Sequence, residues 1–362
     1  MIRILHAADL HLDSPFDALS EEKAALRRRE QRSLLRSLAE IRAEKRADIV
    51  LLSGDLFDSD SSWAETEELL ILTLSEMSVP VFIAPGNHDY YALSSRWSKL
   101  RLPGNVHVFT SSDFDGVVLD ELGARVWGAA FTDRYSEAKL DTLRIPRQDG
   151  LTELVCVHGE VGNPSSRYDP IDERDIAASG ADYIALGHVH SFSGLKKAGK
   201  TYYAWPGCPE GRGFDECGEK GVLIVDAAPG KVRAEFVPTS ARRYERVSVD
   251  ASELDTFRLP AGAQNNIYEV TVTGETGREP DLAALRRALD GQAFALRVKD
   301  ATHICRDVWE RAGEDSLRGV FLRMLRDKYD SARSDAERER ITRAARWGLA
   351  ALDGREEAES LW

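Results

Sequence analysis

Five short motifs combine aspartate, asparagine or histidine with glycine or leucine, and they hold five of the chain's eight histidines. They are Asp9-Leu10-His11, Gly54-Asp55-Leu56-Phe57-Asp58, Gly86-Asn87-His88-Asp89, Val157-His158-Gly159 and Gly187-His188-Val189-His190. Imidazole together with carboxylate and amide oxygens suits Mn, Fe or Zn better than the all-oxygen sites of calcium. One such motif alone could be a turn. The ordered set of five predicts a metal centre.

Each motif follows a predicted strand. The apolar runs at 2–8, 48–53, 79–84, 151–157 and 183–186 do not alternate strictly, which favours strands covered on both faces. Amphipathic helices are predicted over 21–47 and from about Ser61 or Ser62 through residue 74. Alternating strands and helices indicate an α/β fold, in which ligands bind beyond the carboxyl ends of the strands. We therefore expect the five motifs to converge.

The second half of the chain has a different pattern. Hairpin-like strands are predicted over 194–204, 220–226 and 231–237. A small α+β unit is then predicted, with strands at 242–249, 267–274 and 292–300 and helices at 250–257 and 280–290. Residues 307–352 read as helical, since Leu317, Phe321 and Leu325 recur every four residues, as do Ile341 and Ala345. The polar stretch 331–339 reads as a linker between two helices.

Composition excludes some classes of protein. The net charge of −13 argues against a generic polyanion binder, although a local basic groove or a metal site remains compatible with it. No apolar run is long enough to span a membrane, and the start lacks the features of a signal peptide. Four sparse cysteines, at 156, 208, 217 and 305, read as reduced thiols. We expect a cytoplasmic protein that does not enter a membrane.

The chain resembles the calcineurin-like metallophosphoesterases in its ordered set DxH, GDxxD, GNHD, HG and GHxH. The resemblance implies a four-layer β-sandwich flanked by helices, with two bound metal ions. Within that superfamily, the chain is similar to the bacterial DNA repair exonucleases of the SbcD and YhaO type in AADLHLDSPF, GDLFD and WPGCPEGRGFDECGEKGVLIVD. We therefore expect a metallophosphoesterase (nuclease) domain at 1–241, an accessory capping domain at 242–305 and a helical partner-binding segment at 306–362.

The resemblance also implies roles for single residues. The implied ligands of the first metal are Asp9, His11, Asp55 and His190. Those of the second metal are Asp55, Asn87, His158 and His188, with the Asp55 carboxylate bridging. Both ions are expected to be Mn²⁺, with Mg²⁺ or another divalent cation as alternatives, and such a pair clamps a phosphodiester and activates water. His88 would be a catalytic residue that stabilises or protonates the leaving oxygen.

Asp58 departs from the pattern of the better-known repair nucleases, which have a histidine at this place. In the phosphatase branch an aspartate at this spacing orients the GNH histidine, so Asp58 is predicted to act on His88 as a second catalytic residue. Arg212, Phe214 and Glu216 lie in a Gly-rich loop expected to approach the site. Arg212 and Phe214 are candidate substrate contacts, and a turn closed by an ion pair is the alternative.

The basic side of the first predicted helix has two interpretations, a solvated face or a DNA-facing surface. Its residues are Arg27, Arg28, Arg29, Arg32 and Arg36.

These features predict a two-metal DNA nuclease, with exonuclease and single-strand endonuclease activity. One alternative is a phosphatase or phosphodiesterase for small nucleotides or phosphoproteins, which the acidic charge and Asp58 favour. Another is a scaffold subunit with a structural metal site. The resemblance further implies an SMC-like ATPase of the SbcC or YhaN type as partner, docked through the C-terminal helices, and homodimer formation. The same helices could instead fold back on their own domain.

Overall fold

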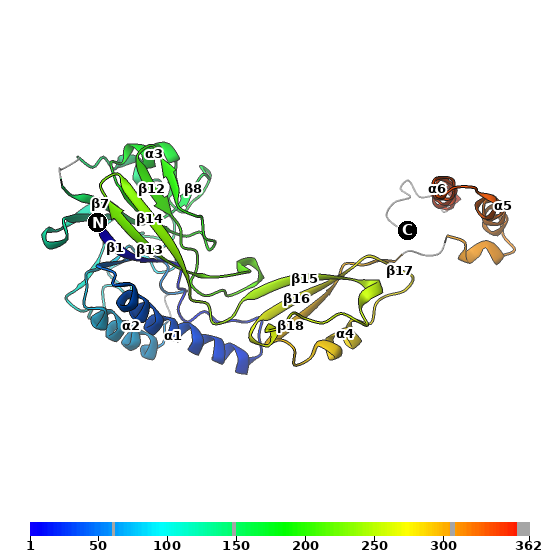
Figure 1. Cartoon of the computed structure of the whole chain (residues 1–362), viewed down its shortest axis with the longest axis horizontal. Helices are drawn as coiled ribbons and strands as arrows, with labels where there is room; N and C mark the ends of the chain where they lie inside the picture. The colour runs from blue at the N-terminus through cyan, green and yellow to red at the C-terminus, as the bar shows by residue number, and fades with distance from the viewer. Residues whose placement is uncertain (60–61, 147–149, 305–307, 353–362) are drawn as a thin grey trace. The chain divides into compact units, whose positions relative to one another are not determined.

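The structure, a computed structural model, describes residues 1–59, 62–146, 150–304 and 308–352 (Figure 1). The chain divides into two compact units, Met1–Tyr244 and Glu245–Trp362. Ser61, Cys305 and the predicted boundary after residue 305 lie outside the described residues. The division into three functional parts remains a prediction.

Two six-stranded sheets form the first unit. The first has the order β14 (Lys231–Pro238), β13 (Gly221–Ala228), β1 (Ile2–Ala7), β2 (Ile49–Leu52), β3 (Val81–Ile83) and β4 (Val106–Val108). The second has the order β11 (Lys196–Ala198), β12 (Thr201–Ala204), β10 (Tyr183–Gly187), β7 (Thr152–His158), β6 (Ala124–Gly128) and β5 (Asp115–Leu119). Strands β1 to β4 are parallel to one another, as are β12, β10, β7 and β6.

The sheets pack face to face, and helices cover their outer faces. Along β1, Ile4 lies in the core between the sheets, whereas Leu5 lies in the core beneath the helices. Helices α1 (Glu21–Lys45) and α2 (Ala64–Met77) cover the first sheet, and α3 (Glu173–Ala178) packs on the second. Because both faces of β1 and β2 are buried, β2 is continuously apolar and β1 is apolar except for Arg3 and His6. The predicted four-layer α/β fold is confirmed.

Helix α2 starts later than predicted. Its first residue is Ala64, and Trp63 occupies the N-cap position without a side-chain cap. Asp13 anchors this helix start, since its carboxylate accepts hydrogen bonds from Trp63 N at 2.9 Å and Thr66 Oγ1 at 2.7 Å. A contact from a residue 50 positions away leaves no local sequence signal.

The second unit begins with a three-stranded sheet in the order β15 (Tyr244–Asp250), β16 (Ile267–Thr273) and β18 (Ala295–Asp300). Helix α4 (Leu282–Leu289) packs on it, and β17 (Glu275–Thr276) pairs with β19 (His303–Ile304). The predicted helix at 250–257 is wrong, since only a 3-10 turn at Ala251–Glu253 forms there. Leu254 and Phe257 pack on the core of this sheet, so the chain turns back after one turn.

Helices α5 (Leu317–Ser331) and α6 (Asp335–Leu352) share a small core that includes Leu322, Ala345 and Leu349. The predicted linker is largely helical, because α5 ends and α6 begins within it. Of the predicted apolar positions, Phe321 and Leu325 pack on this core, while Leu317 is 73% exposed.

No helix within the described ranges is both long enough and apolar enough to cross a lipid bilayer. The three cysteines in those ranges, Cys156, Cys208 and Cys217, form no disulfide.

Candidate metal centre

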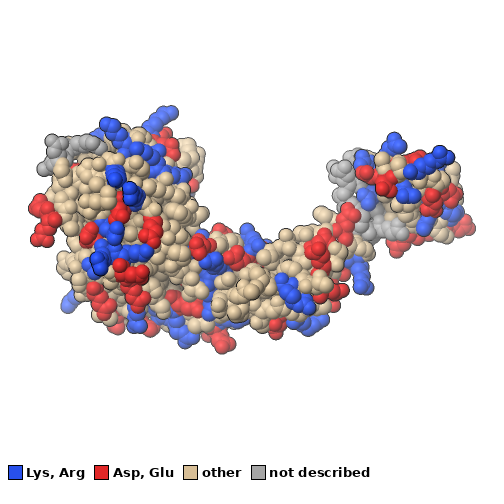
Figure 2. All heavy atoms as spheres, in the orientation of Figure 1, with Lys and Arg blue, Asp and Glu red and all other residues tan. Residues whose placement is uncertain are grey.

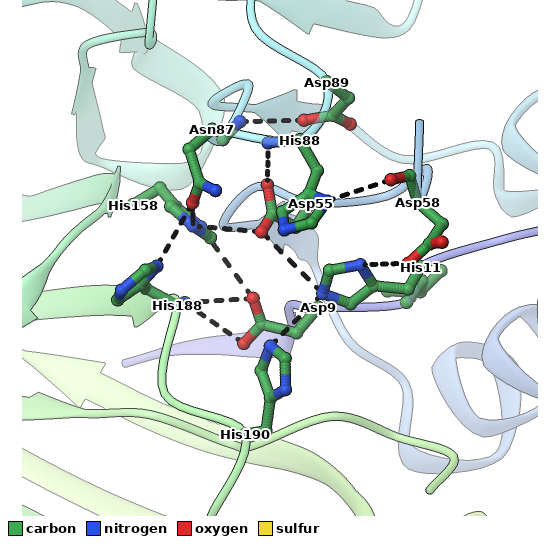
Figure 3. Close-up of polar contacts among 12 residues, drawn as sticks. Asp9, His11, Asp55, Asp58, Asn87, His88, Asp89, His158, His188 and His190 are labelled. Carbon is green, nitrogen blue, oxygen red and sulfur yellow. Dashed lines mark hydrogen bonds and ion pairs between the residues drawn. The ribbon is translucent and has the colours of Figure 1, made fainter. Parts of the chain in front are cut away.

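The structure brings the five motifs together at one edge of the sandwich (Figure 3). Asp9, Asp55 and Asn87 follow the parallel strands β1, β2 and β3 of the first sheet. His158 ends β7 and His188 follows β10 in the second sheet. Parallel strands end at a common edge, so the predicted convergence is confirmed.

Four residues of this edge have left-handed backbone conformations, with φ of 55° at Asp9, 44° at His11, 51° at Asp55 and 90° at His188. Such conformations cost about 1–3 kcal/mol each and persist where the surroundings enforce them. Here Asp9 N donates to Gly54 O at 3.0 Å and His11 N to Asp55 O at 2.9 Å. This clustering of strained residues is typical of a functional site.

Glycine is required where the backbone passes close to side chains of the metal centre. A Cβ on Gly187 would lie 1.9 Å from Ser53 O and 2.7 Å from His158 Nδ1. A Cβ on Gly86 would lie 2.3 Å from Asp55 Oδ1. The glycines of GNHD and GHVH therefore make room for side chains of the centre itself.

The first cluster is formed by Asp9, His11 and His190, whose ligand atoms lie within 4.8 Å of one another. His11 Nδ1 donates to the Asp58 carboxylate at 3.1 Å, and His190 Nδ1 donates to the Glu216 carboxylate at 2.6 Å. Both Nε2 atoms therefore offer lone pairs, and they face each other at 3.2 Å.

Two lone pairs this close repel, and either a proton or a metal ion between them removes the repulsion. Imidazole nitrogens that bind one metal ion each lie about 2 Å from it, so two of them lie within about 4 Å of each other. The spacing of His11 and His190 fits a shared metal ion.

The second cluster is formed by Asp55, Asn87, His158 and His188. His158 Nδ1 donates to Ser53 O at 2.8 Å, which directs Nε2 toward Asn87 Oδ1 at 3.1 Å and Asp55 Oδ2 at 3.4 Å. His188 Nδ1 lies 3.2 Å from the same asparagine oxygen. Nitrogen, amide oxygen and carboxylate oxygen thus converge on a second position for a cation.

Asp55 lies between the two clusters. Its Oδ2 is 3.7 Å from His11 Nε2 in the first cluster and 3.4 Å from His158 Nε2 in the second. Its Oδ1 accepts the backbone N–H of His88 at 2.8 Å. One oxygen of a single carboxylate can therefore serve both positions.

The electrostatics of the centre favour bound positive charge. Burial alone would raise the pKa of Asp55, but His158 and His11 outweigh it and the pKa is lowered. Burial would lower the pKa of His158, yet Asp55 raises it to about 9. Burial, reinforced by Asp55, raises the pKa of Asp89 to about 6. Of these two carboxyl groups, Asp55 is thus the one held in its ionised form, and a metal ion could take the place of a proton on His158.

The predicted contact between the Asp58 carboxylate and His88 is corrected by the structure. His88 is exposed, and its Nδ1 donates to the main-chain oxygen of Asp58 at 2.9 Å. The Asp58 carboxylate instead accepts from His11 and, at 2.7 Å, from Arg212 Nη1. The competing guanidinium explains the difference, because a charged donor holds a carboxylate more strongly than a neutral one does.

Arg212 also binds Glu216, with Nη2 at 2.8 Å from Oε1. Arg212 thus joins the two carboxylates that hold His11 and His190, and we call the set Asp58, Arg212 and Glu216 the clamp. The ion-pair interpretation of the Gly-rich loop therefore accounts for the contacts of Arg212. Phe214 packs edge-on against Tyr244, with ring centroids 5.2 Å apart.

Helix α1 holds this loop from behind. Arg27 is fully buried and donates to Glu210 Oε1 at 2.6 Å and to Gly211 O at 2.9 Å. Gln31, which sequence reasoning missed, donates to His11 O at 2.7 Å. Arg27 and Gln31 are polar residues four positions apart on a buried helix face, and that spacing was the only available signal. Arg27 therefore does not belong to a solvated or DNA-facing surface.

Comparison with known proteins gives a consistent result. The profile of the calcineurin-like phosphoesterase family matches residues 2–192. The uncharacterized metallophosphoesterase YhaO of Bacillus subtilis is 28% identical over 263 residues, which cover 70% of this chain and 64% of YhaO. The SbcD subunit of the nuclease SbcCD from the same organism is 28% identical over 272 residues, covering 64% of this chain and 67% of that protein.

The DNA double-strand break repair protein Mre11 of Aeropyrum pernix is 25% identical over 271 residues, covering 70% of this chain and 64% of that protein. The matches thus span about two thirds of the length of each relative. The family profile covers more than half of the chain and includes all five motifs of the centre. This chain belongs to the calcineurin-like phosphoesterases, a family of metallophosphoesterases.

Proposed function

We propose that this chain is a cytoplasmic two-metal-dependent DNA nuclease with exonuclease and single-strand endonuclease activity. The observation that carries the proposal is the position of Asp55 Oδ2 between two clusters of ligand atoms. The relatives support a nucleic-acid substrate, since two of them are named as part of a nuclease and as a DNA double-strand break repair protein.

The proposed ligands follow from the two clusters. Asp9, His11, Asp55 and His190 would hold one ion, and Asp55, Asn87, His158 and His188 the other. Mn²⁺ suits the mixture of imidazole, carboxylate and amide donors, and Mg²⁺ or another divalent cation is the alternative. When bound, the two ions would neutralise charge on the phosphodiester and activate water for in-line attack.

His88 is proposed to act on the leaving oxygen. The Asp58 carbonyl accepts from its Nδ1 and orients the ring, and the Asp55 carboxylate accepts from its backbone N–H and fixes the backbone. Nε2 is then available to donate a proton when the ring is protonated. A positioned imidazole in this role contributes typically 10²–10⁴-fold to the rate.

Basic residues do not form a continuous face in the view of Figure 2, where lysines and arginines are interspersed with acidic side chains. The chain as a whole is acidic, with a net charge of −13, so its overall charge does not attract DNA. This charge pattern keeps a small-substrate phosphatase or phosphodiesterase as the second candidate function.

Digestion of labelled oligonucleotides tests the proposal. Single- and double-stranded oligonucleotides, an aryl phosphodiester and a phosphopeptide are compared while Mn²⁺ or Mg²⁺ is titrated. We expect metal-dependent cleavage of DNA with the higher kcat/KM. Preferred turnover of the small ester or the phosphopeptide would favour the second candidate, and no turnover with two bound metals would favour a scaffold role.

The clamp should control the first metal position more than the second. Replacing Arg212 with glutamine is expected to weaken the first Mn²⁺ site by roughly tenfold or more, because outer carboxylates orient ligating histidines. Asp58→Asn should have a similar effect through His11. Calorimetric titration with Mn²⁺ would measure both sites.

Arg125→Gln is the matched control, since Arg125 pairs with Glu153 at 2.7 Å within the same unit and has no contact with the clamp among the described interactions. Equal losses at both metal positions would contradict the assignment of the clamp.

The helical segment from residue 306 is proposed to dock an SMC-like ATPase of the SbcC or YhaN type. On α5, Leu317, Val320 and Met324 are 73%, 44% and 63% exposed and share one face at i, i+3 and i+7. Such a stripe is typical of a helix that enters a partner's groove. Homodimer formation is proposed as well.

Replacing Leu317, Val320 and Met324 with glutamate should abolish co-purification with the ATPase and leave the hydrolysis of a small phosphodiester unchanged. Arg326→Glu, at an exposed position of the same helix, is the matched control. Truncation after residue 305 should give the same loss. Retained ATPase binding in the glutamate variant would show that this face is not the docking surface.

A further inference from the structure

A row of aromatic rings in tilted contact begins at His188 and runs away from the metal centre. The ring of Tyr168 lies 4.9 Å from that of His188, with 36° between their planes. The ring of Tyr135 lies 5.7 Å from that of Tyr168, and the guanidinium of Arg167 lies over Tyr135 at 3.7 Å. We call Tyr168, Tyr135 and Arg167 the stacking row.

The backbone beneath the stacking row is fixed. Ser136 N donates to Arg167 O at 2.9 Å, and Asp169 N donates to Ser136 O at 3.0 Å. Lys139 N donates to Asp169 Oδ1 at 2.8 Å, and both of these side chains are buried. The two segments that supply the row are therefore joined by buried polar contacts, and the row is organised before any ligand arrives.

The same segments contact the second cluster of the metal centre at two points. Tyr168 lies against His188 with its ring tilted by 36°, and Phe131, four residues before Tyr135, lies edge-on to His158 at 5.5 Å. The outer end of the row is open, since Tyr135 is 41% exposed and Arg167 is exposed. An aromatic surface thus extends from a proposed ligand of the second metal to solvent.

We propose that the stacking row is a subsite for a nucleobase adjacent to the scissile phosphate. Aromatic faces and a guanidinium plane bind any base through its π face, independently of sequence. A base paired within a duplex is already stacked on its neighbours, so the subsite would select single strands and frayed ends. This inference rests on the proposed function, because the subsite would bind the base of a nucleotide whose phosphodiester lies at the metal centre.

The subsite can be tested with a series of single-stranded oligonucleotides. Each contains one abasic residue, and its position differs from one oligonucleotide to the next. In the unmodified protein, an abasic residue at one position beside the cleaved bond should raise KM by roughly 5- to 150-fold. Tyr135→Leu should remove that difference, whereas Tyr135→Trp, which restores an aromatic face, should keep it. Tyr202→Leu is the matched control. Tyr202 lies on β12 and, like Tyr135, has a cationic side chain over its ring, since Lys197 Nζ is 4.5 Å from the ring centroid.

Metal content separates stacking from a structural effect. Tyr135→Leu should retain the full complement of Mn²⁺, since Tyr135 contacts the centre only through Tyr168 in the described stacking row. The proposal would be overturned if an abasic residue raised KM at no position, or if the abasic effect were undiminished in Tyr135→Leu. Loss of metal in Tyr135→Leu would overturn it too, because the row would then support the centre.

If the protein does not cleave DNA, the nuclease function is refuted but the subsite is not. In that case deoxyguanosine monophosphate and deoxyribose 5-phosphate are compared as inhibitors of aryl phosphodiester hydrolysis. The subsite predicts tighter inhibition by the nucleotide in the unmodified protein and equal inhibition in Tyr135→Leu. Equal inhibition by both compounds in the unmodified protein would refute the subsite.

Discussion

Replacement of Asp55 with asparagine should abolish turnover and tight binding of the second metal. Asp55 Oδ2 lies 3.7 Å from His11 Nε2 and 3.4 Å from His158 Nε2, so one charged oxygen serves both positions. Asparagine keeps the size of the side chain and removes the charge that two dications share. Elemental analysis after desalting and calorimetric titration with Mn²⁺ would measure the change, with turnover measured in parallel.

Asp226→Asn is the matched control for this substitution. Asp226 pairs with Arg3 at 2.8 Å in the same unit, so it also loses one carboxylate charge from an ion pair. It should retain two metals and turnover. Two tightly bound metals in Asp55→Asn would refute the bridging role of this carboxylate.

The sequence predicted the layers and the place of the site because those features are encoded locally. Strands β1, β2 and β7 are buried on both faces, so each contains a short run of mainly apolar residues with a motif at or directly after its end. Strands β4, β5 and β6, which the sequence analysis missed, lie toward the sheet edges. β4 and β5 contain no fully buried residue, and in β6 buried and partly buried residues alternate.

The contacts that hold the proposed ligands could not be predicted in this way. Arg212 and Asp58 are 154 residues apart in sequence, and Arg27 and Glu210 are 183 apart. The Gly-rich spacing predicted a loop near the site but not which carboxylates its arginine would bind. A basic helix face likewise does not reveal that Arg27 is buried, because the partner that neutralises it lies on a distant loop.

Removal of the His88 imidazole should leave both metals in place and lower kcat by roughly 10²-fold or more. Its ring packs edge-on against His11 at 4.8 Å, and its Nδ1 is already committed to the Asp58 carbonyl at 2.9 Å. The ring therefore lies beside His11, a proposed ligand of the first metal, and neither proposed ligand set includes His88. His88→Asn and His88→Ala would be compared by metal analysis and by steady-state kinetics on one oligonucleotide.

The choice between a catalytic residue and a ligand depends on how metal content and turnover change together. A proton donor to the leaving oxygen acts on the chemical step, so kcat should fall with the Mn²⁺ affinity of both positions unchanged. A more acidic leaving group needs less protonation of its oxygen. The loss of kcat in His88→Asn should therefore be smaller on an aryl phosphodiester than on the oligonucleotide. His107→Asn, which removes an imidazole from β4, controls for loss of a ring elsewhere in the same unit. Loss of either metal in His88→Asn would show that His88 is a ligand. An equal loss of kcat on the oligonucleotide and on the aryl phosphodiester would exclude His88 as the proton donor.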